Sequence, residues 1–398
     1  MACCRDRHEK DRPTAGAHQH EQGGAHLAHR NLYEQVRQPP DHSESDEEQP
    51  TPPAHVHLTW PSCLAPVAPG RDELYRHLAM ARVQGETGEL VPPALLVHGG
   101  AGAFSAIERA EQAVDLTDAL AEALEAGWQL LGQAGGAPGQ AGGALDAVVA
   151  AVMSLEDSGR FNAGRGAAPT LDGKVELDAS VMDTTGRLGA VAEVRYPANP
   201  VRLARLVAER GGLPDGPILL AGKGADAFAR ANGLERMKRW RLTGIKSADA
   251  SRQQPGAGSR HGTVGAVAVD RKGRLAAATS TGGRSGQMPG RVGDTPVFGA
   301  GVWADRSTVA VSATGTGEVF VVVGFAHRID WLLREGHDLG VAMDDALAHV
   351  VARGGEGGAV VLRADGSFAA RFNSRAMARG WRDSSGPVAR VLDGGGPS

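Results

Sequence analysis

Residues 261–281 read HGTVGAVAVDRKGRLAAATST, a pattern that predicts a β-hairpin. Small and β-branched apolar residues fill both arms, and the polar RKG between them is a turn signal. A turn centred on Lys272 places Thr263 directly opposite Thr281, with their side chains on one face and their Cβ atoms about 5 Å apart. The sequence therefore predicts two facing hydroxyl groups where the first strand begins.

This threonine pair has two interpretations. Threonine is common in strands, so the pair could simply be a cross-strand contact in an ordinary sheet. Alternatively, Thr263 is a nucleophile, which requires a nearby base. No His–Asp pair is placed to serve it, and His261 is equally well explained as a solvated loop residue. Cleavage of the Gly262–Thr263 bond would supply a free α-amine with a pKa of about 7.7–8, which suits a base at neutral pH.

The segment before the hairpin favours such cleavage. Residues 244–262 read GIKSADASRQQPGAGSRHG, a polar linker without a core-forming pattern, and we expect it to be mobile. Gly262 can adopt backbone conformations that other residues avoid, which would allow a strained peptide bond for the Thr263 hydroxyl to attack. The same hydroxyl would then act first on its own chain and later on substrate.

The rest of the chain from residue 92 predicts a mixture of helices and strands. Strands on both sides of the linker, with helices outside them, predict stacked sheets that share one core. The expected strands are 94–98 (ending in a Gly turn), 175–182, 188–195, 217–221 (buried), 263–270, 274–281, 297–304, 308–313, 359–363 and 367–372, and the expected helices are 105–131, 143–157, 200–210, 224–231, 320–334 and 343–353.

Residues 1–91 differ in composition from the rest of the chain. They contain nine of the 14 histidines, Pro-rich and acidic patches, and no apolar periodicity, so we expect a disordered extension. A histidine metal tract there is the less favoured alternative. The predicted domains are thus 1–91, 92–262 (ending in the 244–262 linker) and 263–398, the last two being parts of one domain.

Composition excludes several classes of function. A net charge of −4 gives no case for a nucleic-acid partner, and no apolar run is long enough for a membrane helix. All three cysteines lie within the first 63 residues, so we expect no disulfides or thiol chemistry beyond them. The charged N-terminus does not resemble a signal peptide, and a cytoplasmic protein is expected.

Several short Gly-rich motifs occur in a fixed order. They are LLVHGGAG (95–102), RFNAGRGA (160–167), ELDASVMD (176–183), HGTVGAVAVD (261–270), TSTGG (279–283), PGRVGD (289–294) and SATGTGE (312–318). Together they resemble the plant-type L-asparaginase/isoaspartyl peptidase family of N-terminal nucleophile hydrolases, over about residues 94–382. The resemblance implies an α+β fold, a four-layer αββα sandwich, made as one precursor and cut at Gly262–Thr263 into α and β chains.

The resemblance also implies roles for individual residues. Thr263 matches the nucleophile, Thr281 the threonine that orients it, and Asn162 an asparagine beside it. Arg291 matches the arginine that binds the substrate α-carboxylate, a task that suits a guanidinium, and Asp294 matches the partner of the α-ammonium group.

Further positions match the family's oxyanion hole and metal loop. Thr314 and Gly315 match the oxyanion-hole pair, and Gly283 and Gly317 match positions near the polar end of the substrate. A loop that holds a structural sodium ion through backbone carbonyls matches Leu155, Glu156, Ser158, Phe161, Ala163 and Arg165. No cofactor for catalysis is implied, and the family forms a dimer of αβ units.

The expected function is autocatalytic activation followed by hydrolysis of L-asparagine to L-aspartate and ammonia, and of β-aspartyl dipeptides. The alternatives are a glycosylasparaginase, a taspase-like threonine hydrolase, or an uncut binding protein. Three departures from the family pattern affect maturation or specificity. Gly262 stands where many members have Asp, Gly286-Gln287 replaces Asn-Lys, and Arg165 replaces a smaller or apolar residue.

Overall fold

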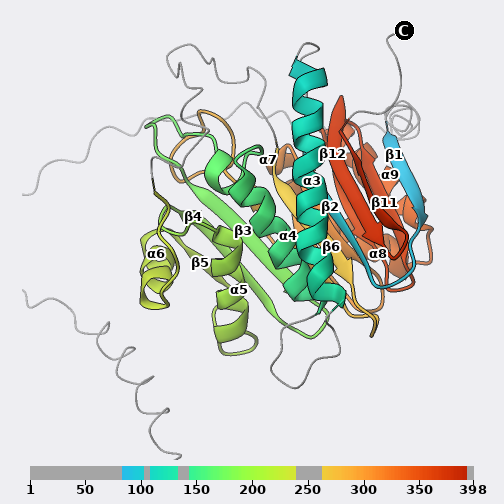
Figure 1. Ribbon diagram of the computed structural model, residues 1–398, viewed down its shortest axis with the longest axis horizontal. Helices are drawn as coiled ribbons and strands as arrows, with labels where there is room; N and C mark the ends of the chain where they lie inside the picture. The colour runs from blue at the N-terminus through green and yellow to red at the C-terminus, as the bar shows by residue number, and fades with distance from the viewer. Residues whose placement is uncertain (1–82, 103–107, 133–142, 239–261, 392–398) are drawn as a thin grey trace, which may run out of the picture. The chain divides into compact units, whose positions relative to one another are not determined.

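The computed structural model describes residues 83–102, 108–132, 143–238 and 262–391, which are built from both helices and strands (Figure 1). Most of the predicted extension (1–82) and most of the linker (244–261) lie outside the described residues. Among those described, no helix has the length and apolar character needed to cross a bilayer.

The described strands form two sheets. The larger has the order β13 (Gly386–Arg390), β12 (Ala376–Asp383), β2 (Ala94–Gly102), β6 (Val264–Val269), β7 (Leu275–Thr281), β3 (Leu177–Asp183), β4 (Leu188–Val194) and β5 (Leu219–Ala221). The smaller has the order β1 (Gln84–Glu89), β11 (Ser367–Phe372), β10 (Gly357–Leu362), β9 (Ala310–Gly315) and β8 (Val302–Ala304). In the larger sheet, β2 and β3 from before the linker flank the hairpin that follows it.

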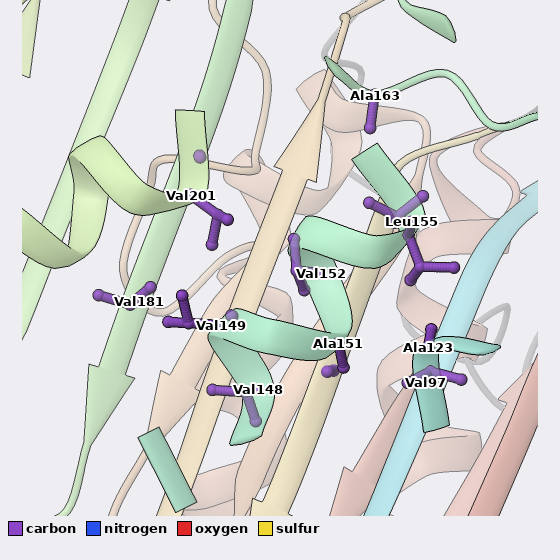
Figure 2. Packing of buried hydrophobic residues seen from close by; sticks show 14 of the residues in the cluster. Val97, Ala123, Val148, Val149, Ala151, Val152, Leu155, Ala163, Val181 and Val201 are labelled. Atoms are coloured by element: carbon purple, nitrogen blue, oxygen red, sulfur yellow. The ribbon is translucent and has the colours of Figure 1, made fainter. Parts of the chain in front are cut away.

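Helices pack against each sheet. The described helices are α3 (Glu108–Gly132), α4 (Ala144–Ser158), α5 (Pro200–Arg210), α6 (Gly222–Ala231), α7 (Gly317–Val323), α8 (Phe325–Arg334) and α9 (Leu339–Ala352). Helices α3, α4 and α5 share one apolar cluster with the larger sheet, whereas α8 and α9 share another with the smaller sheet. Figure 2 shows Val148 and Val152 of α4 in the first of these clusters.

A third apolar cluster contains residues from both sheets, including Val267 of β6 and Val360 of β10. Strand side chains alternate between faces, so β6 sends Val264 and Ala266 toward the helices and Val267 toward the other sheet. Because both faces are covered, β6 and β7 are buried along their whole length, which explains their continuous apolar sequence.

Strand β1 corrects the predicted limit of the disordered extension. We expected no structure before about residue 92, but Gln84–Glu89 pairs antiparallel with β11. Its sequence, QGETGE, has no apolar alternation because it is a mostly exposed edge strand. Ion pairs from Glu86 to the buried Arg379 and to Arg390 attach β1 to the larger sheet.

Several other element predictions also need correction. Strand 94–98 continues through the expected Gly turn to Gly102, because β12 pairs with it around a bulge. The expected strand 297–304 begins only at Val302, and residues 297–301 form turns. Strand 217–221 shortens to β5, an edge strand with two of its three residues exposed.

The single helix expected over 320–334 is two helices. Gly324, with φ of +61°, ends α7 and begins α8, because this left-handed backbone cannot continue a helix. Strands β12 and β13 were not predicted from the sequence.

Candidate active site

The predicted hairpin register is confirmed. Strands β6 and β7 pair antiparallel from Val264 opposite Ser280 to Val269 opposite Leu275. Thr263 lies just before this ladder, and its Oγ1 donates a hydrogen bond of 3.1 Å to Oγ1 of Thr281. Both threonines are buried, so their hydroxyl groups meet in a site with little solvent.

The peptide before Thr263 packs on the glycine-rich end of β2. A Cβ atom on Gly100 would lie 2.4 Å from both the nitrogen and the Cα of Gly262, so the two glycines permit a close backbone contact. A Cβ atom on Gly262 would lie 2.9 Å from Oγ1 of Thr314. The structure therefore brings the predicted cleavage site beside the predicted oxyanion-hole threonine.

Thr314 lies at the end of β9 and is fully buried. Its Oγ1 accepts a hydrogen bond of 3.3 Å from the backbone nitrogen of Ala101. The next residue, Gly315, is exposed and packs closely against the start of β10, because a Cβ there would lie 2.4 Å from the carbonyl oxygen of Glu356 and 2.8 Å from the Cα of Gly357. A hydroxyl group and a backbone N–H are thus adjacent at this strand end.

A cation and a buried carboxyl group lie around Gly317. A Cβ atom on Gly317 would be 2.9 Å from both Nη2 of Arg291 and Oδ1 of Asp294. Nε and Nη2 of Arg291 each lie 2.9 Å from Oε1 of Glu318, which fixes the guanidinium group. Arg291, Asp294 and Gly317 could therefore contact a ligand that carries both an anionic and a cationic group.

Asp294 has an unusual environment. Burial raises its pKa to about 7, an effect that Arg291 opposes and the carboxylates of Asp178 and Glu318 increase. Its Oδ2 atom is buried and has no hydrogen-bond partner within the described parts of the chain. A bound ammonium group would supply both the missing donor and the missing positive charge.

Asn162 supports the chain that follows Thr281. Its side-chain Nδ2 donates to the carbonyl oxygen of Gly283 at 2.6 Å, and its backbone carbonyl oxygen accepts from the backbone nitrogen of Gly282. Its Oδ1 accepts from the nitrogen of Ala168 at 2.9 Å. These contacts place Asn162 beside the threonine pair, where it fixes Gly283, itself at φ of +73°.

The predicted metal loop begins inside α4: Leu155, Glu156 and Ser158 belong to the last turn of the helix, and only Phe161, Ala163 and Arg165 follow it. Ser158 Oγ donates to the carbonyl of Leu155, and the carbonyls of Phe161 and Ala163 accept hydrogen bonds from the loop backbone. The Arg165 guanidinium group caps the carbonyl of Asp157. The Glu156 carboxyl group is buried and accepts from Ser280 Oγ at 2.6 Å, which links this loop to β7.

Glu318 and Gln287 were not among the predicted site residues. Glu318 ends the SATGTGE motif and follows Gly317, so the motif could have marked it as a site residue, but not its contact with Arg291. Gln287 is one of the departures from the family pattern, and it is nearly buried against Gly283. Its Oε1 accepts from the nitrogen of Arg284 at 2.9 Å.

The sequence matches known proteins over most of its length. A family model described as Asparaginase matches residues 91–389. The chain is 43% identical to a plant-type L-asparaginase of Pyrobaculum calidifontis over 302 residues, which cover 72% of this chain and 96% of the relative. It is 42% identical to an isoaspartyl peptidase of Salmonella typhimurium over 308 residues, 72% of this chain and 94% of the relative.

A vertebrate protein gives a similar result. The isoaspartyl peptidase/L-asparaginase of Danio rerio is 42% identical over 298 residues, which cover 72% of this chain and 90% of the relative. The residues matched by the family model, 91–389, include the hairpin and all of the Gly-rich motifs. The chain therefore belongs to the asparaginase family.

Proposed function

We propose that this chain is an N-terminal threonine hydrolase that converts L-asparagine to L-aspartate and ammonia and cleaves β-aspartyl dipeptides. The observation that carries the proposal is the buried hydrogen bond between Thr263 and Thr281. Thr263 is the residue that directly follows the predicted cut. The names of the relatives, L-asparaginase and isoaspartyl peptidase, support this choice of substrates.

Activation breaks the Gly262–Thr263 bond. The Thr263 hydroxyl attacks the carbonyl carbon of Gly262, its proton passes to the departing nitrogen, and water then releases the Gly262 carboxylate. The products are the new α-amine of Thr263 and two chains that remain packed in one domain. We further propose that the three apolar clusters correspond to a four-layer αββα sandwich, which keeps both chains together after the cut.

Substrate hydrolysis then uses the same hydroxyl. The α-amine accepts its proton, Oγ1 attacks the side-chain carbonyl of asparagine, and the proton passes to the leaving ammonia. Thr281 orients Oγ1, while the Thr314 hydroxyl and the Gly315 N–H donate to the developing oxyanion. Water finally hydrolyses the β-aspartyl ester of Thr263 and regenerates the hydroxyl.

Arg291 and Asp294 select the aspartyl unit. The guanidinium group binds the substrate α-carboxylate, and the carboxylate of Asp294 binds the α-ammonium group. Gly317 lies between them without a side chain, so the substrate can approach both. This arrangement requires a free amine and a free carboxylate on the aspartyl unit.

We also propose that the loop after α4 binds a structural sodium ion. Hard cations take oxygen ligands, and the backbone carbonyls of this loop would supply them. A Cβ on Gly166 would lie 2.0 Å from the carbonyl oxygen of Phe161 and 2.9 Å from that of Gly159, which shows that carbonyls converge there. The ion would stiffen the loop that carries Asn162.

A substrate panel tests the proposed function. Purified protein is incubated with L-asparagine, a β-aspartyl dipeptide and glycosyl-asparagine, and released L-aspartate is measured. We expect hydrolysis of the first two substrates. Preference for glycosyl-asparagine would favour the glycosylasparaginase alternative, and an uncut chain without activity toward any of them would contradict the proposal.

The raised pKa of Asp294 predicts a pH dependence of binding. Below pH about 7 its carboxyl group is protonated in the free enzyme and cannot pair with an ammonium group. The inhibition constant of the product L-aspartate should therefore rise about fivefold between pH 7 and pH 6. Asp294→Asn should bind L-aspartate weakly at every pH. An inhibition constant that stays flat from pH 5 to pH 8 would contradict this role of Asp294.

A further inference from the structure

A buried polar layer lies between the two sheets, directly behind the threonine pair. His98 of β2, Thr279 of β7 and Ser312 of β9 are all fully buried. Nε2 of His98 lies 2.9 Å from Oγ of Ser312, which in turn lies 2.7 Å from Oγ1 of Thr279. Three side chains from three strands thus form one continuous chain of hydrogen bonds.

The register relates each member to a residue of the candidate site. Side chains on one face of a strand recur every two residues. Thr279 is therefore the next residue along β7 on the same face as Thr281, and Ser312 is the next residue along β9 on the same face as Thr314. On the remaining two strands, His98 pairs with Gly265, which stands two residues after Thr263. The polar layer is therefore the first layer beneath the proposed catalytic groups.

Gly265 makes this layer possible. A Cβ atom there would lie 1.9 Å from Oγ of Ser312 and 2.4 Å from Nε2 of His98. Any side chain on Gly265 would occupy the space in which His98 of one sheet forms its hydrogen bond with Ser312 of the other. A glycine on the strand of the proposed nucleophile therefore allows His98 and Ser312 to meet.

The layer contrasts with the one behind it, where Leu96, Val267 and Ala277 form apolar contacts. An apolar layer would also fill the space beside the site, but it would not fix directions as hydrogen bonds do. Burial lowers the pKa of His98 to about 3, although the backbone of Thr263 opposes this. Because burial makes protonation of this imidazole unfavourable, it is a poor base, and we assign its contacts to orienting groups rather than to proton transfer.

We propose that His98 is a positioning residue that acts through Ser312 and Thr279 on the proposed catalytic threonines. The network ties β9, which carries Thr314, to β7, which carries Thr281, and to the strand pair β2–β6 that carries Gly100 and Thr263. Its loss would misalign the hydroxyl groups by fractions of an ångström while leaving the Arg291 and Asp294 side chains in place. This inference rests on the proposed function.

Paired variants test the network. Thr279→Val removes the hydroxyl group at nearly constant shape, whereas Thr279→Ser keeps it. We expect Thr279→Val and Ser312→Ala to lower kcat about 10- to 100-fold with KM within threefold of wild type, because misplaced reacting groups lose rate more than binding. Thr279→Ser should stay within threefold in kcat. All rates are normalised to the measured amount of free N-terminal Thr263.

The double variant His98→Leu with Ser312→Ala tests whether the residues act as one unit. The factor by which kcat falls in the double variant should be clearly smaller than the product of the factors measured for His98→Leu alone and Ser312→Ala alone. Thr308→Val is the matched control, because Thr308 is also a buried hydroxyl group, but it donates to Asp330 on α8. This control should lower the melting temperature and leave kcat within threefold.

The outcomes separate this inference from the proposed function. An active wild-type enzyme whose kcat is unchanged in Thr279→Val and Ser312→Ala would overturn the network inference alone. The network inference would also be overturned if Thr308→Val lowered kcat as much as Thr279→Val does, or if Thr279→Ser did so. A wild-type protein without activity toward asparagine or β-aspartyl dipeptides would instead overturn the proposed function.

Discussion

Thr263→Ala is expected to leave one uncut chain and to abolish hydrolysis of L-asparagine. The variant lacks the hydroxyl that attacks both the Gly262 carbonyl and the substrate. Loss of an attacking side chain lowers kcat by a factor on the order of 10⁴ to 10⁶ in hydrolases. A denaturing gel and intact mass report the cut, and ammonia release reports the activity.

Thr263→Ser is the matched control, because it keeps the hydroxyl group and loses only the methyl group. We expect it to be cut, more slowly than wild type, and to retain measurable activity. Edman sequencing of its smaller fragment should begin at residue 263. Two fragments separated near residue 262 in Thr263→Ala would show that another group breaks the chain, and would contradict self-cleavage by Thr263.

Arg291→Ala should raise KM and lower kcat/KM for L-asparagine by about 100-fold. A hydrogen bond to a charged group contributes about 1.5–3 kcal/mol, and the substrate α-carboxylate would lose its cationic partner. Arg291→Lys keeps the charge but not the planar fork, so an intermediate loss is expected. Steady-state kinetics with L-asparagine and with one β-aspartyl dipeptide provide the measurement.

Arg284→Ala controls for the general loss of positive charge. Arg284 lies in the same part of the chain and also faces Glu318, but its side chain is 57% exposed and its ion pair is longer, at 3.7 Å. We expect this variant to stay within threefold of wild type. Undiminished kcat/KM in Arg291→Ala, or an equal loss in Arg284→Ala, would contradict carboxylate binding by Arg291.

The hairpin was predictable because its information is local. A short turn and a period of two residues are enough to place Thr263 opposite Thr281, and the observed pairing follows. By contrast, the pattern of β1 carries no such information. Its residues become a strand only because β11, more than 270 positions later, offers a free edge for hydrogen bonding.

The family resemblance implied a set of candidate site residues, but it did not imply the contacts between them. The resemblance implied a binding role for Arg291 and Asp294, yet the contact between Arg291 and Glu318 joins two motifs and residues 27 positions apart. Asn162 was expected beside the nucleophile, and its hydrogen bonds in fact hold Gly283. Such contacts depend on how loops fold back, which spacing alone does not specify.

By itself, the sequence determined the hairpin register and the order of the motifs, since these depend on near neighbours. The resemblance of the motifs to a known family then implied which residues carry the proposed chemistry. The packing of one sheet on the other decided that Thr314 lies beside Gly262, and that His98 meets Ser312 in the space left by Gly265. Side-chain alternation gives the face of each strand. Only the stacking of two sheets, driven by burial of apolar residues such as Val267 and Val360, decides which faces meet.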